Sequence, residues 1–167
     1  DSLERIPAQR FDPDALDGTV LALSAKQAHF LLRPELFDNS YFRISRAETA
    51  AMDPHQRLLL QTSYAGLAGC GESRRSLLSS ATAVLVGIMT DGEWCTCQQK
   101  AMQGKPMSAF AANGSGPAAL AGRVSFVLGL KGPCFSVAAV CSSSLVALDA
   151  GSQNPRLGRC LAAVVSG

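Results

Sequence analysis

Hydrophobic positions change their spacing along this 167-residue chain, and the spacing predicts which elements form. Thr82 to Ile88 is a short apolar run that ends near Asp91-Gly92, a pattern typical of a strand buried on both faces. Phe135 to Val140 is a second strand-like run, and a third begins near Leu161. Helical patterns lie between these runs. Alternation of helices with buried strands predicts an α/β fold with a largely parallel sheet.

Two helices are predicted before the first buried strand. Ser45 and Glu48 form a capping-box pattern, which opens a short helical turn. A longer helix begins after Asp53, which caps it, has Pro54 at its first position and reaches about Ala68. One face of this longer helix carries hydrophobic side chains, namely Leu60, Tyr64 and Leu67.

Two further helices flank the second strand. One covers residues 115–128 and is closed by Gly129. The other follows the strand with a helical pattern over Leu145 to Asp149, and Pro155 is expected to terminate it because proline has no backbone N–H to donate. Residues 10–25 are predicted to be irregular, and no internal repeat is found.

The junction between the second strand and its helix carries Cys141, followed by three serines. The thiolate is the attacking species in thiol chemistry. A helix N-terminus offers unpaired N–H groups and a positive dipole end, which stabilise an anion and donate to a developing oxyanion. Serine is also a favoured N-cap residue. The junction is therefore suited to a nucleophile, although the local pattern equally fits a small buried hydrophobe at a strand end.

Several sequence blocks, spread over nearly the whole chain, match the motifs of one enzyme family in the right order. They are Leu36–Asn39, Phe42–Glu48, Asp53–Leu60 (DPHQRLLL), Ala121–Phe126, Leu130–Pro133, Val140–Leu148 (VCSSSLVAL) and Gly158–Ala163. Each block alone is a weak signal, and the ordered set is specific. The chain resembles the ketosynthase (condensing-enzyme) domains of polyketide synthases, which belong to the thiolase-like superfamily.

This resemblance implies an incomplete thiolase-like α/β fold and a beta-ketoacyl synthase activity in polyketide or fatty-acid biosynthesis. Cys141 is implied as the nucleophile, which accepts an acyl chain as a thioester while its backbone N–H serves as an oxyanion donor. The acyl group comes from the phosphopantetheine arm of an acyl carrier protein. A malonyl-type extender is then decarboxylated, and its carbanion attacks the Cys141-bound acyl group in a Claisen condensation.

The same resemblance bears on partners and on histidines. It implies a homodimer in the complete domain and no directly bound cofactor or metal. The two assisting histidines of the family would lie downstream of this chain. His29 and His55 match neither of them, so both are interpreted as structural or surface residues, although a cysteine–histidine pair with Cys141 stays open.

Some positions depart from the family pattern. Ala138-Ala139-Val140 stand where polyketide ketosynthases usually carry Asp-Thr-Ala, and His55 stands where glutamine is usual. The lost polar groups motivate an alternative function, a non-catalytic ketosynthase-like scaffold or dimerisation module. The retained Cys141 argues against the decarboxylase-only subtype, in which glutamine replaces the cysteine.

A length of 167 residues fits one ordinary domain, whereas complete condensing-enzyme domains are more than twice as long. Residues 1–167 are therefore expected to form a partial ketosynthase domain, the N-terminal half, without the first strand and the C-terminal half. Such a half would leave a helix face without its partner. We expect the fragment alone to be inactive, and to be poorly soluble or to self-associate unless another chain completes it.

Composition and charge exclude some other functions. Hydrophobic residues make up 47% and charged residues 17%, which argues for a packed core rather than disorder. The net charge of +2 is too small to argue for a nucleic-acid partner. No apolar run is long enough for a membrane span, and Asp1–Glu4 has no secretory-signal layout. A cytoplasmic location is the default expectation, with targeting left open because the chain resembles an internal fragment.

Six cysteines are present, but their spacing does not predict a disulfide framework or a zinc site. Cys95 and Cys97 come closest to a metal-ligand pair, in a polar segment, residues 91–105, that is expected to form a loop. Residues 113–115 are expected to form a Gly-rich loop that caps the next helix, and Arg74-Arg75 a solvated turn. Because the chain shows no secretory signal, its cysteines are expected to be reduced thiols.

Overall fold

The computed structural model describes residues 3–7, 27–31, 33, 35–89, 93–102 and 109–167. It divides into two compact units, Asp1–Leu36 and Phe37–Gly167. In the first unit, strands β1 (Leu3–Arg5) and β2 (Gln27–His29) pair in antiparallel fashion. Neither strand was predicted, because three residues are too few to show a hydrophobic period. The predicted irregular segment, residues 10–25, lies outside the described residues.

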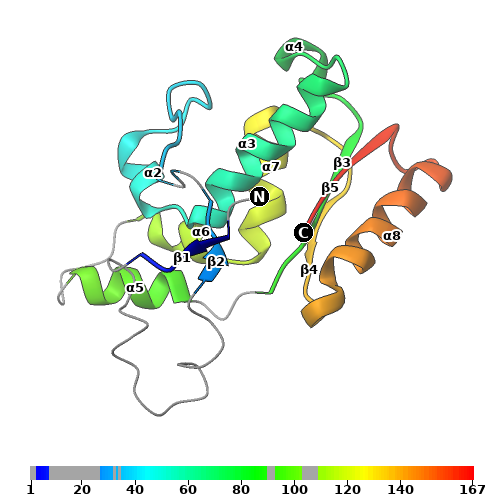
Figure 1. Cartoon of the computed structure of the whole chain (residues 1–167). Helices are drawn as coiled ribbons and strands as arrows, with labels where there is room; N and C mark the ends of the chain where they lie inside the picture. Colours follow the sequence, from blue (N-terminus) through cyan, green and yellow to red (C-terminus); the bar gives the residue numbers. More distant parts are fainter. Residues whose placement is uncertain (1–2, 8–26, 32, 34, 90–92, 103–108) are drawn as a thin grey trace. The chain divides into compact units, whose positions relative to one another are not determined.

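The second unit is built around a three-stranded parallel sheet with the order β4-β3-β5 (Figure 1). The strands are β3 (Thr82–Gly87), β4 (Cys134–Val137) and β5 (Ala162–Ser166). Every residue of the central strand β3 is buried, as its continuous apolar run predicted. The helices are α2 (Arg46–Ala51), α3 (Pro54–Gly69), α4 (Arg74–Leu77), α5 (Glu93–Met102), α6 (Ala111–Ser115), α7 (Ala118–Leu128) and α8 (Ser143–Arg156).

The chain path puts helices on both faces of the sheet. The connection from β3 to β4 contains α7, and the connection from β4 to β5 contains α8 and passes over β3. Because parallel crossovers are right-handed and these two run in opposite directions, their helices lie on opposite faces. Figure 1 shows α3 and α7 on one side of the sheet and α8 on the other.

Alternate residues of β3 join two separate hydrophobic clusters, because successive side chains of a strand point to opposite faces. Val84 packs with Leu60 of α3 and Val124 of α7. Leu85 packs with Ala147 of α8. The predicted α/β fold with a parallel sheet is therefore confirmed, and the core has two layers.

Two predicted helix ends are confirmed. Asp53 caps α3, since its Oδ1 accepts a hydrogen bond from His55 N at 2.8 Å, and Pro54 is the first helical residue. Leu60 on this helix is fully buried, with Tyr64 and Leu67 packed against the same cluster. α7 ends at Gly129, whose φ of +72° is the left-handed value that glycine adopts most easily.

Three predicted loops or turns are instead helical. The polar segment 91–105 contains α5, rich in good helix formers such as Glu93 and Lys100. Residues 113–115 lie in α6, where Gly114 packs against the Ala51 backbone so closely that a Cβ would collide with it. Arg74 and Arg75 open α4 rather than a free turn. Polarity and glycine content suggested loops, but helix propensity and tertiary packing make these segments helical.

Three predicted details near element ends also differ. β4 ends at Val137, before the predicted Val140. Val140 itself has a left-handed φ of +51°, which a strand does not accommodate. α8 is longer than Leu145 to Asp149, and Pro155 lies inside its last turn. Only half of the first capping box forms: Ser45 Oγ accepts from Glu48 N at 3.1 Å, while the Glu48 carboxylate pairs with Arg123.

Candidate active site

Cys141 lies in a one-turn 3₁₀ helix, η1 (Val140–Ser142), between the carboxyl end of β4 and the start of α8. Its side chain is exposed. The carboxyl ends of parallel strands are the usual location of sites in open α/β sheets. The predicted position of the cysteine, at a strand-to-helix junction, is therefore correct.

Serine hydroxyls hold this turn in place. Ser143 Oγ accepts from Ala139 N at 2.9 Å and donates to Val140 O at 2.7 Å. Ser142 Oγ donates to Ala139 O at 2.7 Å. Ser142 occupies the N-cap position of α8 but makes no side-chain capping bond there. Ser143, 5% exposed, is thus the residue that ties the turn to the strand end.

The backbone before the cysteine is strained. Val140 has a φ of +51°, and a β-branched residue in the left-handed region is a genuine outlier. Such outliers persist where the surroundings over-determine them, and they cluster at functional sites. Val140 lies between β4 and α8, and the next residue, Cys141, has an exposed side chain.

Close packing at Gly87 supports the turn from the neighbouring strand. A Cβ on Gly87, the last residue of β3, would lie 2.5 Å from the Ser143 carbonyl carbon and oxygen. Only glycine lets the two backbones approach this closely. The start of α8 is therefore seated directly on the end of the central strand.

The arrangement offers both parts that acyl transfer to a thiol needs, an accessible nucleophile and a backbone N–H on the same residue. The backbone hydrogen bonds of the turn are donated by Ser142 N, to Ala139 O, and by Ser143 N, to Val140 O. Within the described part of the chain, the Cys141 N–H takes part in none of them. A backbone N–H in this position can donate to the oxygen of a tetrahedral intermediate.

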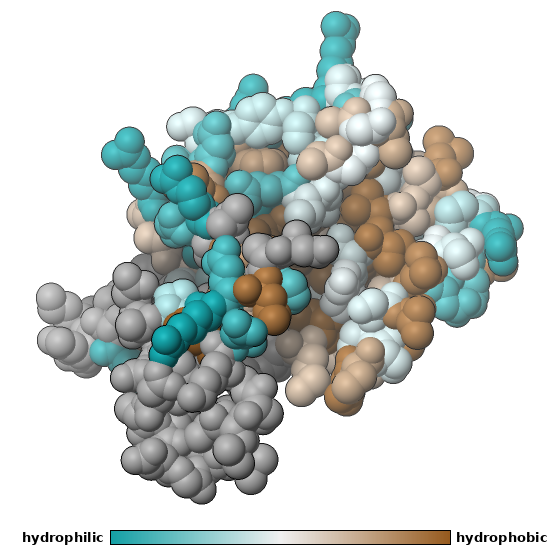
Figure 2. Space-filling view, in the orientation of Figure 1, coloured by the Kyte–Doolittle hydropathy of each residue, from teal (hydrophilic) through white to brown (hydrophobic). Residues whose placement is uncertain are grey.

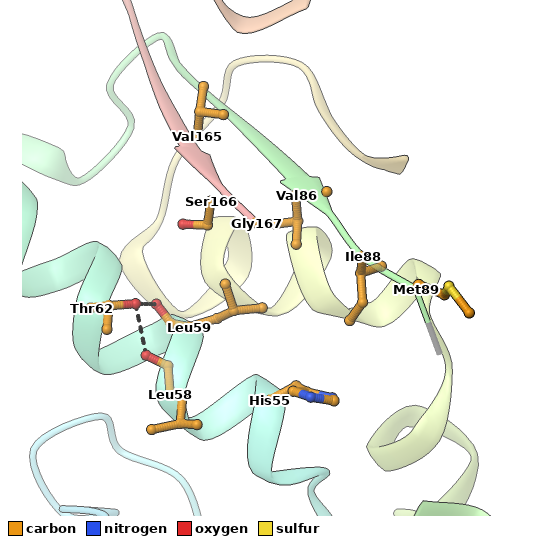
Figure 3. A pocket seen from close by; sticks show the side chains of 11 residues that line it. His55, Leu58, Leu59, Thr62, Val86, Ile88, Met89, Val165, Ser166 and Gly167 are labelled. Carbon is orange, nitrogen blue, oxygen red and sulfur yellow. Dashed lines mark hydrogen bonds between the residues drawn. The ribbon is translucent and has the colours of Figure 1, made fainter. Parts of the chain in front are cut away.

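A cavity of about 530 Å³ lies at the same edge of the sheet (Figure 3). Its walls come from the first half of α3, the end of β3 with the two residues after it, and the end of β5. Gly87, which contacts Ser143, is among the lining residues. Gly87 therefore borders the cavity and also contacts the start of α8, although α3 and α8 lie on opposite faces of the sheet.

His55 stands at the rim of this cavity (Figure 3). Its Nδ1 lies 3.1 Å from Asp53 Oδ1, and its side chain is 57% exposed. His29, in the first unit, is exposed on β2. The interpretation of His55 as a surface residue fits its exposure, and its contact with the capping Asp53 gives it a structural role at the start of α3.

Hydrophobic side chains are exposed around the turn and along α8. Figure 2 shows them on the side of the second unit where α8 lies in Figure 1. Val140 is 63% exposed, Leu145 70% and Leu148 56%. An extended exposed apolar patch is characteristic of an interaction surface.

No metal centre is found in the described part of the chain. A group of three or more His, Cys, Asp or Glu side chains that could hold a metal ion does not occur there. The cysteines Cys70, Cys97, Cys134 and Cys160 are free thiols, as is Cys141. Among the described residues, no helix is long and apolar enough for a membrane span.

Three residues of the site could not be identified from the sequence. Ser143 looks the same as its serine neighbours, Val140 looks like a strand residue, and Gly87 looks like the end of an apolar run. Their roles depend on a left-handed backbone conformation and on a contact between segments more than fifty residues apart. A glycine within a buried strand was the one available signal, since it often marks close backbone approach.

Comparison with known proteins identifies the family. The sequence model described as "Beta-ketoacyl synthase, N-terminal domain" matches residues 1–167. The cyclo-acetoacetyl-L-tryptophan synthase of Aspergillus oryzae is 42% identical over 131 residues, 78% of this chain and 3% of that protein. The polyketide synthase GfsE of Streptomyces halstedii is 36% identical over 176 residues, 100% of this chain and 4% of that protein.

Solved structures agree in fold. The oxazolomycin ketosynthase domain OzmH KS7 of Streptomyces albus JA3453 has a TM-score of 0.78 and 32% identity, over 96% of this chain and 28% of that chain. A ketosynthase from module 6 of the bacillaene synthase of Bacillus subtilis 168 has a TM-score of 0.75 and 28% identity, over 96% of this chain and 25% of that chain. The chain thus spans about a quarter of these ketosynthase structures and a few per cent of the curated relatives. This chain, with its thiolase-like ketosynthase fold and its cysteine turn, belongs to the beta-ketoacyl synthase family.

Proposed function

We propose that this chain supplies the acyl-accepting nucleophile of a beta-ketoacyl synthase. The complete domain would elongate carrier-protein-bound acyl chains by decarboxylative Claisen condensation with malonyl-type extenders, in polyketide or fatty-acid biosynthesis. The observation that carries the proposal is Cys141, an exposed thiol on a strained turn at the carboxyl end of β4. Its partners would be an acyl carrier protein and, in the complete domain, a second copy.

In the first step, the Cys141 thiolate attacks the carbonyl carbon of an acyl thioester on the phosphopantetheine arm. A bond forms between Sγ and the carbonyl carbon, the bond from that carbon to the carrier sulfur breaks, and the carrier thiolate takes up the proton that the Cys141 thiol had lost. The Cys141 N–H donates to the oxyanion that forms between these events. In the second step, a malonyl-type thioester loses carbon dioxide, and the resulting carbanion displaces Cys141 from the acyl carbon.

The alternative, a non-catalytic scaffold or dimerisation module, rests on Ala138 and Ala139. Polar side chains at these positions would be expected to support the turn. Here the support comes from Ser142 and Ser143, which bond to the Ala139 backbone. The turn therefore holds its geometry without polar groups at 138 and 139, which favours the catalytic function.

Acylation of Cys141 tests the proposal. The complete domain is incubated with an acyl thioester of N-acetylcysteamine, which mimics the phosphopantetheine end, and the peptides are analysed by mass spectrometry. We expect one acyl mass on the peptide that contains Cys141, and Cys141→Ala should abolish it. Cys134→Ala is the matched control, because Cys134 is also exposed and lies on β4, and this variant should label like the wild type.

Acyl label that survives Cys141→Ala would refute the assignment of the nucleophile. A wild-type domain that binds carrier protein and dimerises, but neither accepts an acyl group nor forms product, would instead establish the scaffold. Labelling without condensation would separate the two steps and place the defect in the extender reaction.

A further inference from the structure

A second cavity, of about 480 Å³, lies among α2, α4 and α7, and four arginines line it. They are Arg43, Arg74, Arg75 and Arg123. Within the described part of the chain, Glu48 is the one carboxylate in its lining. The cavity does not share a lining residue with the first cavity, which Gly87 borders. Its excess of positive charge therefore belongs to a separate part of the unit.

One of the four arginines is neutralised within the protein. Arg123 forms an ion pair with Glu48, and its Nε donates to Gln56 Oε1 at 3.3 Å. The two side chains of the ion pair are 11% and 25% exposed. This pair accounts for the one carboxylate, so three positive charges remain in the lining.

Arg74 is held firmly but by uncharged groups. Its Nη1 donates to Tyr41 O, its Nη2 to Val127 O at 3.4 Å, and its guanidinium carbon lies 5.5 Å from the centre of the Tyr41 ring. A hydrogen bond with Tyr64 raises the pKa of the Tyr41 phenol, and a tyrosine with an ordinary pKa is already uncharged at neutral pH. These contacts orient the guanidinium without cancelling its charge.

Arg43 and Arg75 complete the set and are both exposed. Among the described residues, neither forms an ion pair. Arg43 has a φ of +56°, in the left-handed region that favours glycine. Arg43 thus lines the cavity although its backbone has a conformation that is unfavourable for a residue with a side chain.

The lining of this cavity also contains apolar side chains. Phe126, in the last turn of α7, is 84% exposed, and Leu78, directly after α4, is 67% exposed. Guanidinium groups match phosphate and carboxylate oxygens with pairs of parallel N–H donors. Three unneutralised charges complement a ligand with two or more negative charges better than a single carboxylate.

We propose that this cavity binds a phosphate-bearing small molecule, whose oxyanion contacts Arg43, Arg74 and Arg75 and whose organic part packs on Phe126 and Leu78. The site is distinct from the proposed acyl-transfer site. It would add a ligand to this chain that the condensation chemistry does not require.

Isothermal titration calorimetry with pyrophosphate, at constant ionic strength, tests the proposal. Inorganic phosphate and citrate are titrated in parallel, since citrate carries multiple charges on carboxylates. The test variant is Arg43→Gly with Arg75→Gln, and the matched control is Arg156→Gln with Arg159→Gln, two exposed arginines at the far end of α8. We expect pyrophosphate affinity to fall at least about tenfold in the test variant, as lost charge-assisted hydrogen bonds predict, and to stay unchanged in the control.

Equal pyrophosphate affinity in the two double variants would overturn the site. Citrate binding as tight as pyrophosphate binding would overturn the preference for phosphate. Arg43→Gly alone guards against a folding defect, because it removes a charge and also relieves the left-handed strain. We expect this variant to have a higher melting temperature and weaker pyrophosphate binding. Unchanged pyrophosphate affinity, or weaker affinity together with a lower melting temperature, would contradict the proposed role of Arg43.

Discussion

The two faces of the sheet in the second unit are packed in different ways. Large side chains fill the space between the sheet and the α3–α7 layer, and Leu60, Val124 and Leu128 are almost completely buried there. On the other face, α8 approaches through small residues such as Ala147 and Gly151, and its leucines point into solvent. The α3–α7 face therefore carries most of the hydrophobic stabilisation, while the α8 face carries the cysteine turn and an uncovered apolar surface.

This difference has a structural reason. A helix packed through alanine and glycine can lie close to the sheet, which seats its first residues on the end of β3. This close contact between α8 and β3 positions the Cys141 turn, but it buries little apolar area. Stability and candidate chemistry are thus assigned to opposite faces of one sheet.

The largest effect should come from the α3–α7 face. Leu60→Ala removes a side chain that is 0% exposed and should lower the free energy of unfolding by about 2–5 kcal/mol. Leu145→Ala, at a side chain 70% exposed on α8, is the matched control and should change it by less than about 0.5 kcal/mol. Urea denaturation followed by circular dichroism measures both. Equal losses would contradict the difference between the faces.

A methyl group at Gly87 should disrupt the close contact between the end of β3 and the start of α8. Gly87→Ala places a Cβ against the Ser143 backbone and should cost about 1–3 kcal/mol of unfolding free energy. Gly66→Ala is the control, because Gly66 lies in α3 with nothing within 4 Å of a new Cβ, and it should stabilise by about 0.5–1 kcal/mol. Thermal unfolding of the two variants should shift in opposite directions, and a shared direction would argue against the close contact.

A smaller effect is expected at the turn itself. Ser143→Ala removes the acceptor for Ala139 N and the donor to Val140 O, which should cost about 0.5–1.5 kcal/mol. The rate of Cys141 alkylation by iodoacetamide, relative to that of Cys134 in the same molecule, should change as the turn loosens. Ser144→Ala, at an exposed serine, should leave both quantities unchanged. An unaltered alkylation ratio in Ser143→Ala would mean that Ser143 does not hold the turn.

The smallest change in stability is expected where an exposed apolar side chain of α8 is replaced by a polar one. Leu148→Gln replaces a side chain that is 56% exposed on α8, and the unfolding free energy should move by less than about 0.5 kcal/mol. Binding of the dye ANS, which reports exposed apolar surface, should nevertheless decrease. A large loss of stability would show that this leucine belongs to the core and that the two faces are more alike than their burial indicates.

The regular elements were largely predictable because their signals are local. The Asp53-Pro54 start of α3, the apolar run of β3 and the Gly129 end of α7 each depend on neighbours within a few residues. The helices α4, α5 and α6 were missed. Their polar or glycine-containing sequences are typical of loops, and in α6 the helix fits because Gly114 lies against α2.

The features of the cysteine turn likewise fall into those that the sequence predicted and those that only the structure shows. The sequence by itself determined the α/β class, the resemblance to ketosynthases and the place of Cys141 at a strand-to-helix junction, because each follows from residue order. Only the tertiary structure decided the left-handed Val140, the anchoring bonds of Ser143 and the contact of Gly87 with α8. The Gly87 contact joins segments more than fifty residues apart, which local patterns do not encode. The Val140 and Ser143 features lie within a few residues of each other, but valine and serine at these positions do not by themselves indicate a left-handed residue or an anchoring hydroxyl.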